Sequence, residues 1–199
     1  EICLAGSRLF VQESIYAKVR EELLKRVREI KVGNPLETST QMGAIISSEQ
    51  MEKVQSYIEI GKKDGKLLFG GERLKDLGEG NFLSPALISD IDNNSKVCQE
   101  EIFGPVLPII PFKNEEDLLE MVNSTPYGLS CSVWTNDANR QHRMARDIKS
   151  GIVWVNCWFA RDLRTPFGGQ KSSGIGREGG RWALEFFSEM KTICYRFKA

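Results

Sequence analysis

Between residues 129 and 156 the chain alternates strand, helix and strand, a rhythm that few folds accommodate. Residues 129–135 and 151–156 are apolar enough for strands, and residues 137–149 between them have the length and polarity of a helix. Strands that alternate with helices of this length build an α/β layer in which the strands run mostly parallel. The sequence therefore predicts an α/β fold, with a largely parallel open sheet and flanking helices.

The rest of the chain supplies further elements of the same two kinds. Residues 106–112 contain Pro108 and Pro111, and a proline cannot donate to a strand ladder, so this strand is expected at the edge of the sheet or broken. Ser47 and Asn114 are predicted helix caps. Helices are expected over residues 13–30, 47–65, 114–122 and about 181–190, and strands over residues 7–11, 66–69, 82–91, 106–112 and 192–197.

Charge and cysteine content exclude several classes of protein. The 199 residues carry 27 Lys and Arg against 27 Asp and Glu, a formal net charge of zero that gives no electrostatic reason to expect nucleic acid or an anionic membrane as partner. No apolar run approaches the roughly 18 to 20 residues of a membrane helix. Five scattered cysteines and one histidine, His142, fit neither a zinc site nor a disulfide framework. We therefore expect a cytoplasmic protein with reduced thiols and no metal.

One glycine motif has the spacing of a cofactor site, but the sequence on either side of it argues against that function. Residues 174–179 read Gly-Ile-Gly-Arg-Glu-Gly, the literal spacing of a dinucleotide fingerprint. Such a fingerprint leaves a strand directly and is followed about 20 residues later by an acid. Here the preceding strand ends near Asn156, and residues 191–194 supply no acid. The glycines are instead predicted to let a loop pack tightly against its neighbours.

Two stretches in the first half of the chain carry candidate chemistry, each with a plain structural alternative. Cys3 lies among small residues ahead of a short strand, and it is either a nucleophile or a buried structural thiol. Glu100 and Glu101 precede an aromatic residue and a Gly-Pro turn. These two acids either bind a ligand hydroxyl or end a helix in solvent.

A third stretch, residues 158–169, follows a strand at the position where α/β folds bind their ligands. It places Arg161 and Arg164 among three aromatic residues, and arginine beside aromatic walls suits a planar carboxylate. The alternative is that Arg161 and Asp162 are surface charges that only fix the loop.

Taken in order, these motifs resemble the C-terminal catalytic domain of the NAD(P)-dependent aldehyde dehydrogenase superfamily. The likeness spans essentially the whole chain, and three stretches carry it: the Glu-Ile-Cys and Gly-Ser-Arg of residues 1–8, the Glu-Glu-Ile-Phe-Gly-Pro-Val of residues 100–106, and the Pro-Phe-Gly-Gly signature that begins residues 166–178. The resemblance implies a catalytic domain over residues 1–190 and a strand for an oligomerisation sheet over residues 191–199. It also implies a homo-dimer or tetramer for the full-length protein.

The resemblance further implies a role for each site residue. Cys3 becomes the nucleophile, whose thiolate attacks the aldehyde carbon and whose own backbone N–H helps to hold the oxyanion. Hydride then passes to the nicotinamide, and water hydrolyses the thioester to the acid. Glu101 is implied to bind the nicotinamide ribose hydroxyls, and Phe103 to pack by the nicotinamide end. Phe167 and Arg161 are implied to line the aldehyde tunnel. The implied cofactor is NAD, or else NADP.

Residues 158–166 resemble one branch in particular, the 2-hydroxymuconic and 2-aminomuconic semialdehyde dehydrogenases with the carboxymethyl-hydroxymuconic semialdehyde enzymes close by. Their substrates carry a carboxylate away from the aldehyde, and Arg161 or Arg164 is expected to bind it. Betaine-aldehyde enzymes compete for the assignment, although a cationic substrate should avoid two arginines. A coenzyme A-acylating relative is a further alternative, as is a catalytically silent interaction module in which Cys3 is only structural.

Glu1 to Gly6 include neither an initiator methionine nor a secretory signal, which leads us to expect a chain derived from a longer protein. In the family that it resembles, a Rossmann domain, a general-base Glu and an oxyanion-hole Asn precede the cysteine motif. Losing a single oxyanion donor lowers the rate about 10²–10³-fold. The 199 residues by themselves are therefore expected to be inactive.

Overall fold

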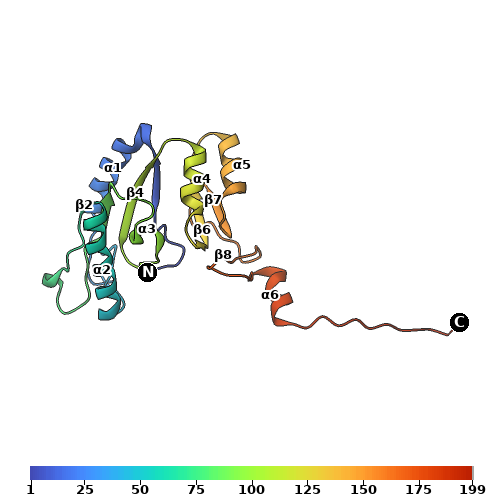
Figure 1. Cartoon of the computed structure of the whole chain (residues 1–199). Helices are drawn as coiled ribbons and strands as arrows, with labels where there is room; N and C mark the ends of the chain where they lie inside the picture. Colours follow the sequence, from blue (N-terminus) through green and yellow to red (C-terminus); the bar gives the residue numbers. More distant parts are fainter. Residues whose placement is uncertain (199) are drawn as a thin grey trace. The chain divides into compact units, whose positions relative to one another are not determined.

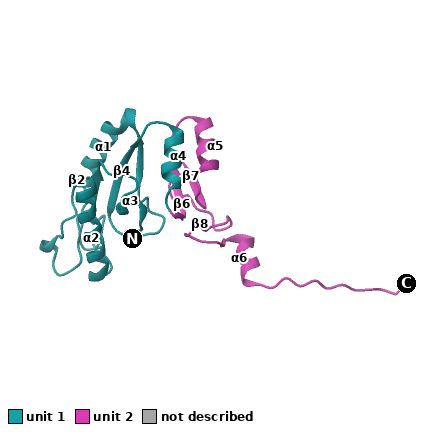
Figure 2. Ribbon diagram, viewed as in Figure 1, with its two compact units in different colours: residues 1–125 teal, residues 126–199 magenta. Residues whose placement is uncertain are grey.

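The computed structural model describes residues 1–198, which form two compact units (Figure 2). The first unit covers residues 1–125, and the second begins at Pro126. Ala199 lies outside the described residues, so the predicted oligomerisation strand is described only as far as residue 198. No helix among residues 1–198 has the length and apolarity that crossing a membrane requires.

The first unit is built on a four-stranded sheet in the order β1-β4-β3-β2 (Figure 1). The pairings of β4 with β1 and of β3 with β4 are parallel, and that of β2 with β3 is antiparallel. The largely parallel open sheet of the sequence prediction is therefore confirmed. Its strands are β1 (Leu9–Gln12), β2 (Lys66–Phe69), β3 (Ala86–Ser89) and β4 (Val106–Phe112).

Four helices flank this sheet, and the sequence predicts three of them but not the short helix of residues 96–99. The Ser47 side chain accepts a hydrogen bond from the Gln50 backbone N–H at 3.1 Å, and the Asn114 side chain accepts one from that of Asp117 at 2.9 Å, so both predicted caps are confirmed. Buried side chains on α2 follow the helical period. The helices are α1 (Glu13–Arg28), α2 (Ser48–Asp64), the short α3 (Lys96–Gln99) and α4 (Glu115–Asn123).

The position predicted for β4 is wrong. Despite its two prolines, β4 is a central strand with β3 on one side and β1 on the other. Residues 106–108 pair with β3, and residues 109–112 pair with β1. Each half of β4 is therefore paired on one side only, and Pro108 falls at the last pair with β3. This staggered pairing admits prolines that a continuously paired central strand would exclude.

The second unit contains the strand–helix–strand rhythm that the sequence predicts. Strands β6 (Ser130–Val133) and β7 (Ile152–Val155) pair in parallel, and α5 (Ala138–Asp147) connects them. Two short strands, β5 (Tyr127–Gly128) and β8 (Gln170–Lys171), pair antiparallel. The last helix is α6 (Gly180–Phe187).

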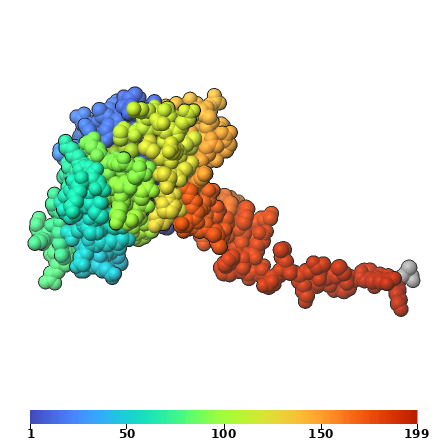
Figure 3. Space-filling view, in the orientation of Figure 1, coloured from blue at the N-terminus to red at the C-terminus, as the bar shows by residue number. Residues whose placement is uncertain are grey.

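Beyond α6 the chain continues as an exposed segment, drawn in red at the end of the molecule in Figure 3. The sequence predicts a strand over residues 192–197, but in the structure these residues form no strand and belong to none of the sheets. Its use in an oligomerisation sheet stays a prediction.

Candidate functional site

The predicted site residues fall in both units. Cys3, Glu101 and Phe103 belong to the first unit, and Arg161, Arg164 and Phe167 belong to the second. Each group is therefore described within its own unit.

Cys3 lies in a tight turn at the start of the first unit. The Ala5 backbone N–H donates to the Ile2 carbonyl oxygen at 3.0 Å, and the Leu4 side chain beside Cys3 is only 4% exposed. Leu4 thus anchors the turn, while the Cys3 thiol remains exposed. Among the described residues, nothing engages the Cys3 backbone N–H. Cys3 is not the buried structural thiol of the alternative interpretation, and its thiol and N–H are both open to a ligand.

The two adjacent acids of the first unit have different surroundings. The Tyr57 hydroxyl donates to the Glu100 carboxylate at 2.5 Å, so Glu100 is held by α2. Glu101 is exposed, and within residues 1–198 the contact it makes is through its backbone oxygen, which accepts from the Lys53 ammonium at 3.0 Å. Of the two, Glu101 has the carboxylate with open acceptor positions. A carboxylate of this kind suits the paired hydroxyl donors of a ribose, which the implied cofactor carries.

Phe103, two residues further on, has a backbone conformation that non-glycine residues seldom adopt. Its φ is 58°, in the left-handed region, and its side chain is 38% exposed. Residues held in this region cluster at ligand-binding and active sites. The partly exposed ring, two residues from Glu101 in the chain, therefore offers an apolar surface to a flat ligand.

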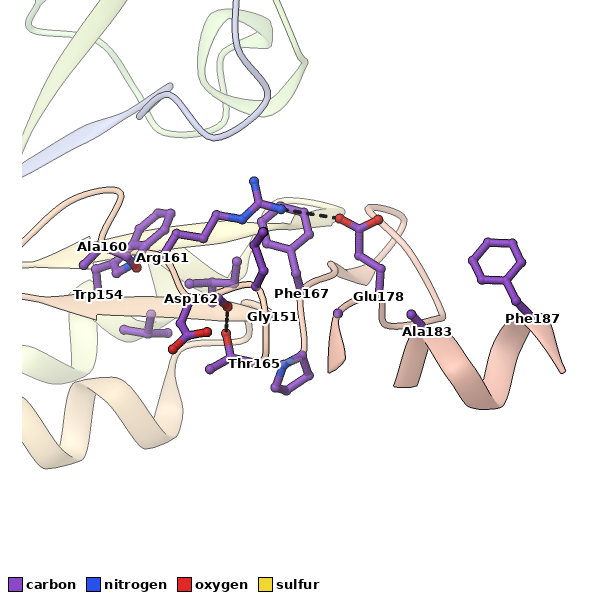
Figure 4. Close-up of a pocket in the computed structure, with 15 residues that line it drawn as sticks. Gly151, Trp154, Ala160, Arg161, Asp162, Thr165, Phe167, Glu178, Ala183 and Phe187 are labelled. Carbon is purple, nitrogen blue, oxygen red and sulfur yellow. Dashed lines mark hydrogen bonds and ion pairs between the residues drawn. The ribbon is translucent and has the colours of Figure 1, made fainter. Parts of the chain in front are cut away.

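The second unit contains a cavity of about 560 Å³ beside β7 (Figure 4). Its lining includes the predicted residues Arg161 and Phe167 but not Arg164. The Trp154 indole N–H donates to the Ala160 carbonyl oxygen at 2.8 Å and so fixes the loop that leads to Arg161. The full lining consists of residues 151–154, 160–163, 165–167, 178, 179, 183 and 187.

Arg161 is held over an aromatic ring in this cavity. Its guanidinium carbon lies 4.3 Å from the centroid of the Phe167 ring, and its Nη2 lies 3.5 Å from Glu178 Oε1. Phe167 and Glu178 are joined by two backbone hydrogen bonds of 2.8 Å, which set both side chains beside the arginine. Figure 4 shows the guanidinium above the ring with Glu178 at one side of it. The remaining donors of Arg161 suit a planar carboxylate.

Arg164 has a local role instead. Its Nη2 lies 2.5 Å from Asp162 Oδ2, and its side chain is 88% exposed. The hydrogen bonds from Arg164 lower the pKa of Asp162 below its ordinary value. Arg164 therefore has the loop-fixing role that the alternative interpretation gave to Arg161, with Asp162 as its partner.

Sequence reasoning missed Glu178 and Trp154 as parts of this site. Glu178 belongs to the Gly-Arg-Glu motif that helped to carry the family resemblance, so its place in the motif was the available signal. Trp154 lies inside a strand pattern, and nothing in that pattern marks its indole as a loop anchor. Among residues 1–198, no group of His, Cys, Asp or Glu gathers in a way that would hold a metal ion.

The sequence profile of the Aldehyde dehydrogenase family matches residues 1–193. A 2-aminomuconic semialdehyde dehydrogenase of Mus musculus is 44% identical over 99% of the chain, and the chain spans 42% of that relative's length. The solved structure of HpcC from Thermus thermophilus matches the whole chain with a TM-score of 0.92 and 42% identity, over 41% of its own length.

A solved betaine aldehyde dehydrogenase of Staphylococcus aureus in complex with NAD+ matches 94% of the chain with a TM-score of 0.90 and 38% identity, over 38% of its length. The chain thus spans about two-fifths of the length of the relatives that it matches. With a family match over nearly all of its residues, the chain belongs to the aldehyde dehydrogenase family.

Proposed function

We propose that this chain carries the catalytic cysteine, part of the cofactor site and part of the substrate site of an oxidoreductase. The enzyme oxidises a carboxylated semialdehyde to the acid with a nicotinamide cofactor. Family membership supports aldehyde oxidation, and a relative named for a semialdehyde supports the substrate class. The observation that carries the substrate class is Arg161, stacked 4.3 Å above Phe167 in a cavity of about 560 Å³.

Cys3 is the proposed nucleophile. Its thiolate sulfur bonds to the aldehyde carbon, and the carbonyl π electrons move to the oxygen, which the open Cys3 N–H helps to hold. When bound, the nicotinamide would supply the acceptor for the hydrogen of that carbon as hydride, and Cys3 would then hold the acyl group as a thioester. Water adds to the thioester carbon, the carbon–sulfur bond breaks, and the acid leaves with Cys3 restored. The exposure of Cys3 supports this role.

Glu101 and Phe103 are the proposed contacts for the nicotinamide end of the cofactor. The open carboxylate suits the two ribose hydroxyls, and the exposed ring suits the edge of the nicotinamide. We propose NAD, which the NAD+-bound Staphylococcus aureus structure supports. The nicotinamide ribose is the same in NADP, so these two residues accept either cofactor.

A betaine-aldehyde activity is the second candidate, favoured by the structural likeness to a betaine aldehyde dehydrogenase. Its substrate carries a fixed positive charge. Arg161 would place a second positive charge in the proposed site, where Asp162 and Glu178 also line the cavity. Asp162 is paired with Arg164 and Glu178 lies beside Arg161, so the donors that Arg161 has left favour the carboxylated semialdehyde.

The full-length enzyme is proposed to be a cytoplasmic homo-dimer or tetramer. All five cysteines are free thiols, which suits a reducing compartment. Residues 191–199 are the proposed oligomerisation segment. The 199 residues alone are expected to be inactive, since they span about two-fifths of the length of their relatives.

The test is a pair of arginine substitutions in the full-length enzyme. Arg161→Met removes the proposed carboxylate contact, so kcat/KM for a carboxylated semialdehyde should fall roughly 10- to 100-fold, as expected for a lost charged hydrogen bond. An uncharged aldehyde of the same length should be oxidised nearly as before. Arg164→Met, the matched control, should leave both values unchanged. Equal effects of the two variants on the carboxylated substrate would refute the assignment.

A further inference from the structure

The loop that carries Arg161 is exposed and has no regular secondary structure. Residues 156–166 belong to no helix or strand, and residues 158–166 are all exposed. Two residues of the loop, Asn156 and Phe159, have φ of 54° and 60°, in the left-handed region that is costly for residues other than glycine. Burial in a core therefore does not fix the shape of this loop, which depends on specific contacts instead.

Polar contacts fix the place where the loop leaves the sheet. The Ser132 hydroxyl donates to the Cys157 carbonyl oxygen at 3.1 Å. The Asn156 side-chain amide makes two hydrogen bonds of 2.9 Å with the backbone of Thr135, one as acceptor and one as donor. These contacts hold the first two residues of the loop against the end of β6. The direction of the chain over residues 158–161 is set further along.

Trp154 makes the contact that folds the loop back. Trp154 lies in β7, where it pairs with Ser132 of β6, and it is only 7% exposed. Its indole N–H donates to the Ala160 carbonyl oxygen, six residues ahead, at 2.8 Å. The centroid of its ring lies 6.5 Å from that of Phe159. A buried side chain of a paired strand therefore holds the exposed loop, and Figure 4 shows Trp154, Ala160 and Arg161 close together.

This contact acts on the peptide group that leads into Arg161. The Ala160 carbonyl carbon is bonded to the Arg161 nitrogen, so a hydrogen bond to the carbonyl oxygen restrains the plane of that peptide. At its other end, the Arg161 guanidinium lies over the Phe167 ring and beside Glu178. Arg161 is therefore held at both ends, by Trp154 through the backbone and by Phe167 and Glu178 through the side chain.

We propose that Trp154 is a positioning residue for Arg161 and thereby sets the preference of the enzyme for carboxylated aldehydes. It acts through the Ala160 carbonyl and keeps the guanidinium in the cavity, over the Phe167 ring. The inference rests on the proposed function, in which Arg161 binds the substrate carboxylate. A side chain that is held in place before its ligand arrives loses less conformational freedom on binding, so the Trp154 contact contributes to the affinity for that carboxylate.

The test uses the full-length enzyme with Trp154→Phe, which keeps an aromatic ring and removes the N–H donor. The value of kcat/KM for a carboxylated semialdehyde should fall about three- to tenfold, through a rise in KM, as expected for losing one neutral hydrogen bond. An uncharged aldehyde of the same length should be oxidised as before. Trp134→Phe, the same substitution at an exposed tryptophan directly after β6, is the matched control and should leave both values unchanged.

Combining Trp154→Phe with Arg161→Met shows whether Trp154 acts through the arginine. Once the guanidinium is gone, a shift of the loop has no carboxylate contact left to weaken. In the Arg161→Met background, Trp154→Phe should therefore change kcat/KM for the carboxylated substrate by less than about twofold. The full loss in that background, or an equal loss with the uncharged aldehyde, would mean that Trp154 only supports the fold and would overturn the proposal.

A second variant covers the case in which Trp154→Phe does not fold. Site-specific incorporation of benzothienylalanine at position 154 keeps a ring of indole size with sulfur in place of the N–H, and it serves in the same comparisons. Arg161→Met alone separates this inference from the proposed function. An unchanged kcat/KM for the carboxylated semialdehyde in Arg161→Met refutes the proposed carboxylate site. A lowered value there, with Trp154→Phe matching Trp134→Phe, refutes only the positioning role.

Discussion

Two thiols of the first unit, those of Cys3 and Cys98, differ in their exposure to solvent. Cys98 on α3 is 5% exposed, and burial raises the pKa of its thiol to about 11, whereas Cys3 is exposed. Iodoacetamide reacts with the thiolate form of an accessible cysteine. In the folded protein at pH 8, Cys3 should therefore be alkylated well before Cys98. Peptide mass spectrometry after timed alkylation measures both rates, and equal rates would contradict the burial of Cys98.

The burial of Cys98 also makes the stability of the fold depend on pH in the alkaline range. The pKa of Cys98 rises from 9.0 to about 11 on folding, so the unfolded chain loses this proton first. The contribution of Cys98 to stability is complete below about pH 9 and is lost as the pH rises through about 11, by at most about 2 to 3 kcal/mol. Cys98→Ala should remove this component. Denaturant unfolding of both proteins at pH 8 and pH 11 measures it, because other titrating groups cancel between them.

Substitutions in the glycine-rich loop of residues 174–179 can show whether its glycines serve packing or cofactor binding. Gly179 has φ of 91°, and a Cβ there would collide with the Thr165 carbonyl oxygen. Gly179→Ala should therefore destabilise the second unit by about 1 to 3 kcal/mol and lower its thermal unfolding midpoint. It should also disturb the bridge between Phe167 and Glu178 that supports Arg161, since Glu178 is its neighbour in the chain.

Gly176 is the control within the same motif, because nothing lies within 4 Å of a Cβ built there. Gly176→Ala should leave the unfolding midpoint nearly unchanged. In a dinucleotide fingerprint, the second glycine lets the backbone approach the pyrophosphate, so an added methyl group there would weaken NAD binding. We expect the Kd of NAD in the full-length enzyme to be unaffected. A large loss of NAD affinity in Gly176→Ala would restore the fingerprint interpretation.

Across the whole molecule, local sequence patterns were enough to predict most helices and strands but not which strands pair with each other. The periodicity of residues 129–156 predicted β6, α5 and β7, because alternation and helix caps are local properties of the sequence. The central place of β4 depends on a stagger between two neighbouring strands, which no local pattern reveals. In the candidate site, the sequence did not show whether Arg161 or Arg164 would bind the substrate carboxylate. The difference between them arises from side-chain partners, Phe167 for one and Asp162 for the other.

Near the end of the chain, large apolar side chains alternate with other residues, and in the single molecule these apolar side chains are exposed. Ile193, Tyr195 and Phe197 are 60%, 76% and 87% exposed, and polar or small residues separate them. The rings of Tyr195 and Phe197 stack with centroids 6.4 Å apart, which places them on one face. An extended segment with one apolar face can pair with the edge of another sheet. We expect it to do so with a second copy of the full-length protein.

Tyr195→Lys places a charge in the middle of this apolar face and should lower the oligomeric state of the full-length enzyme, because burying an unpaired ammonium between copies is costly. Light scattering coupled to size-exclusion chromatography, at one protein concentration, measures the change. Arg196→Gln alters the opposite face of the same segment and should leave the assembly intact. If Tyr195→Lys and Arg196→Gln assemble alike, the apolar face of residues 193–197 does not hold the copies together, and another surface must do so.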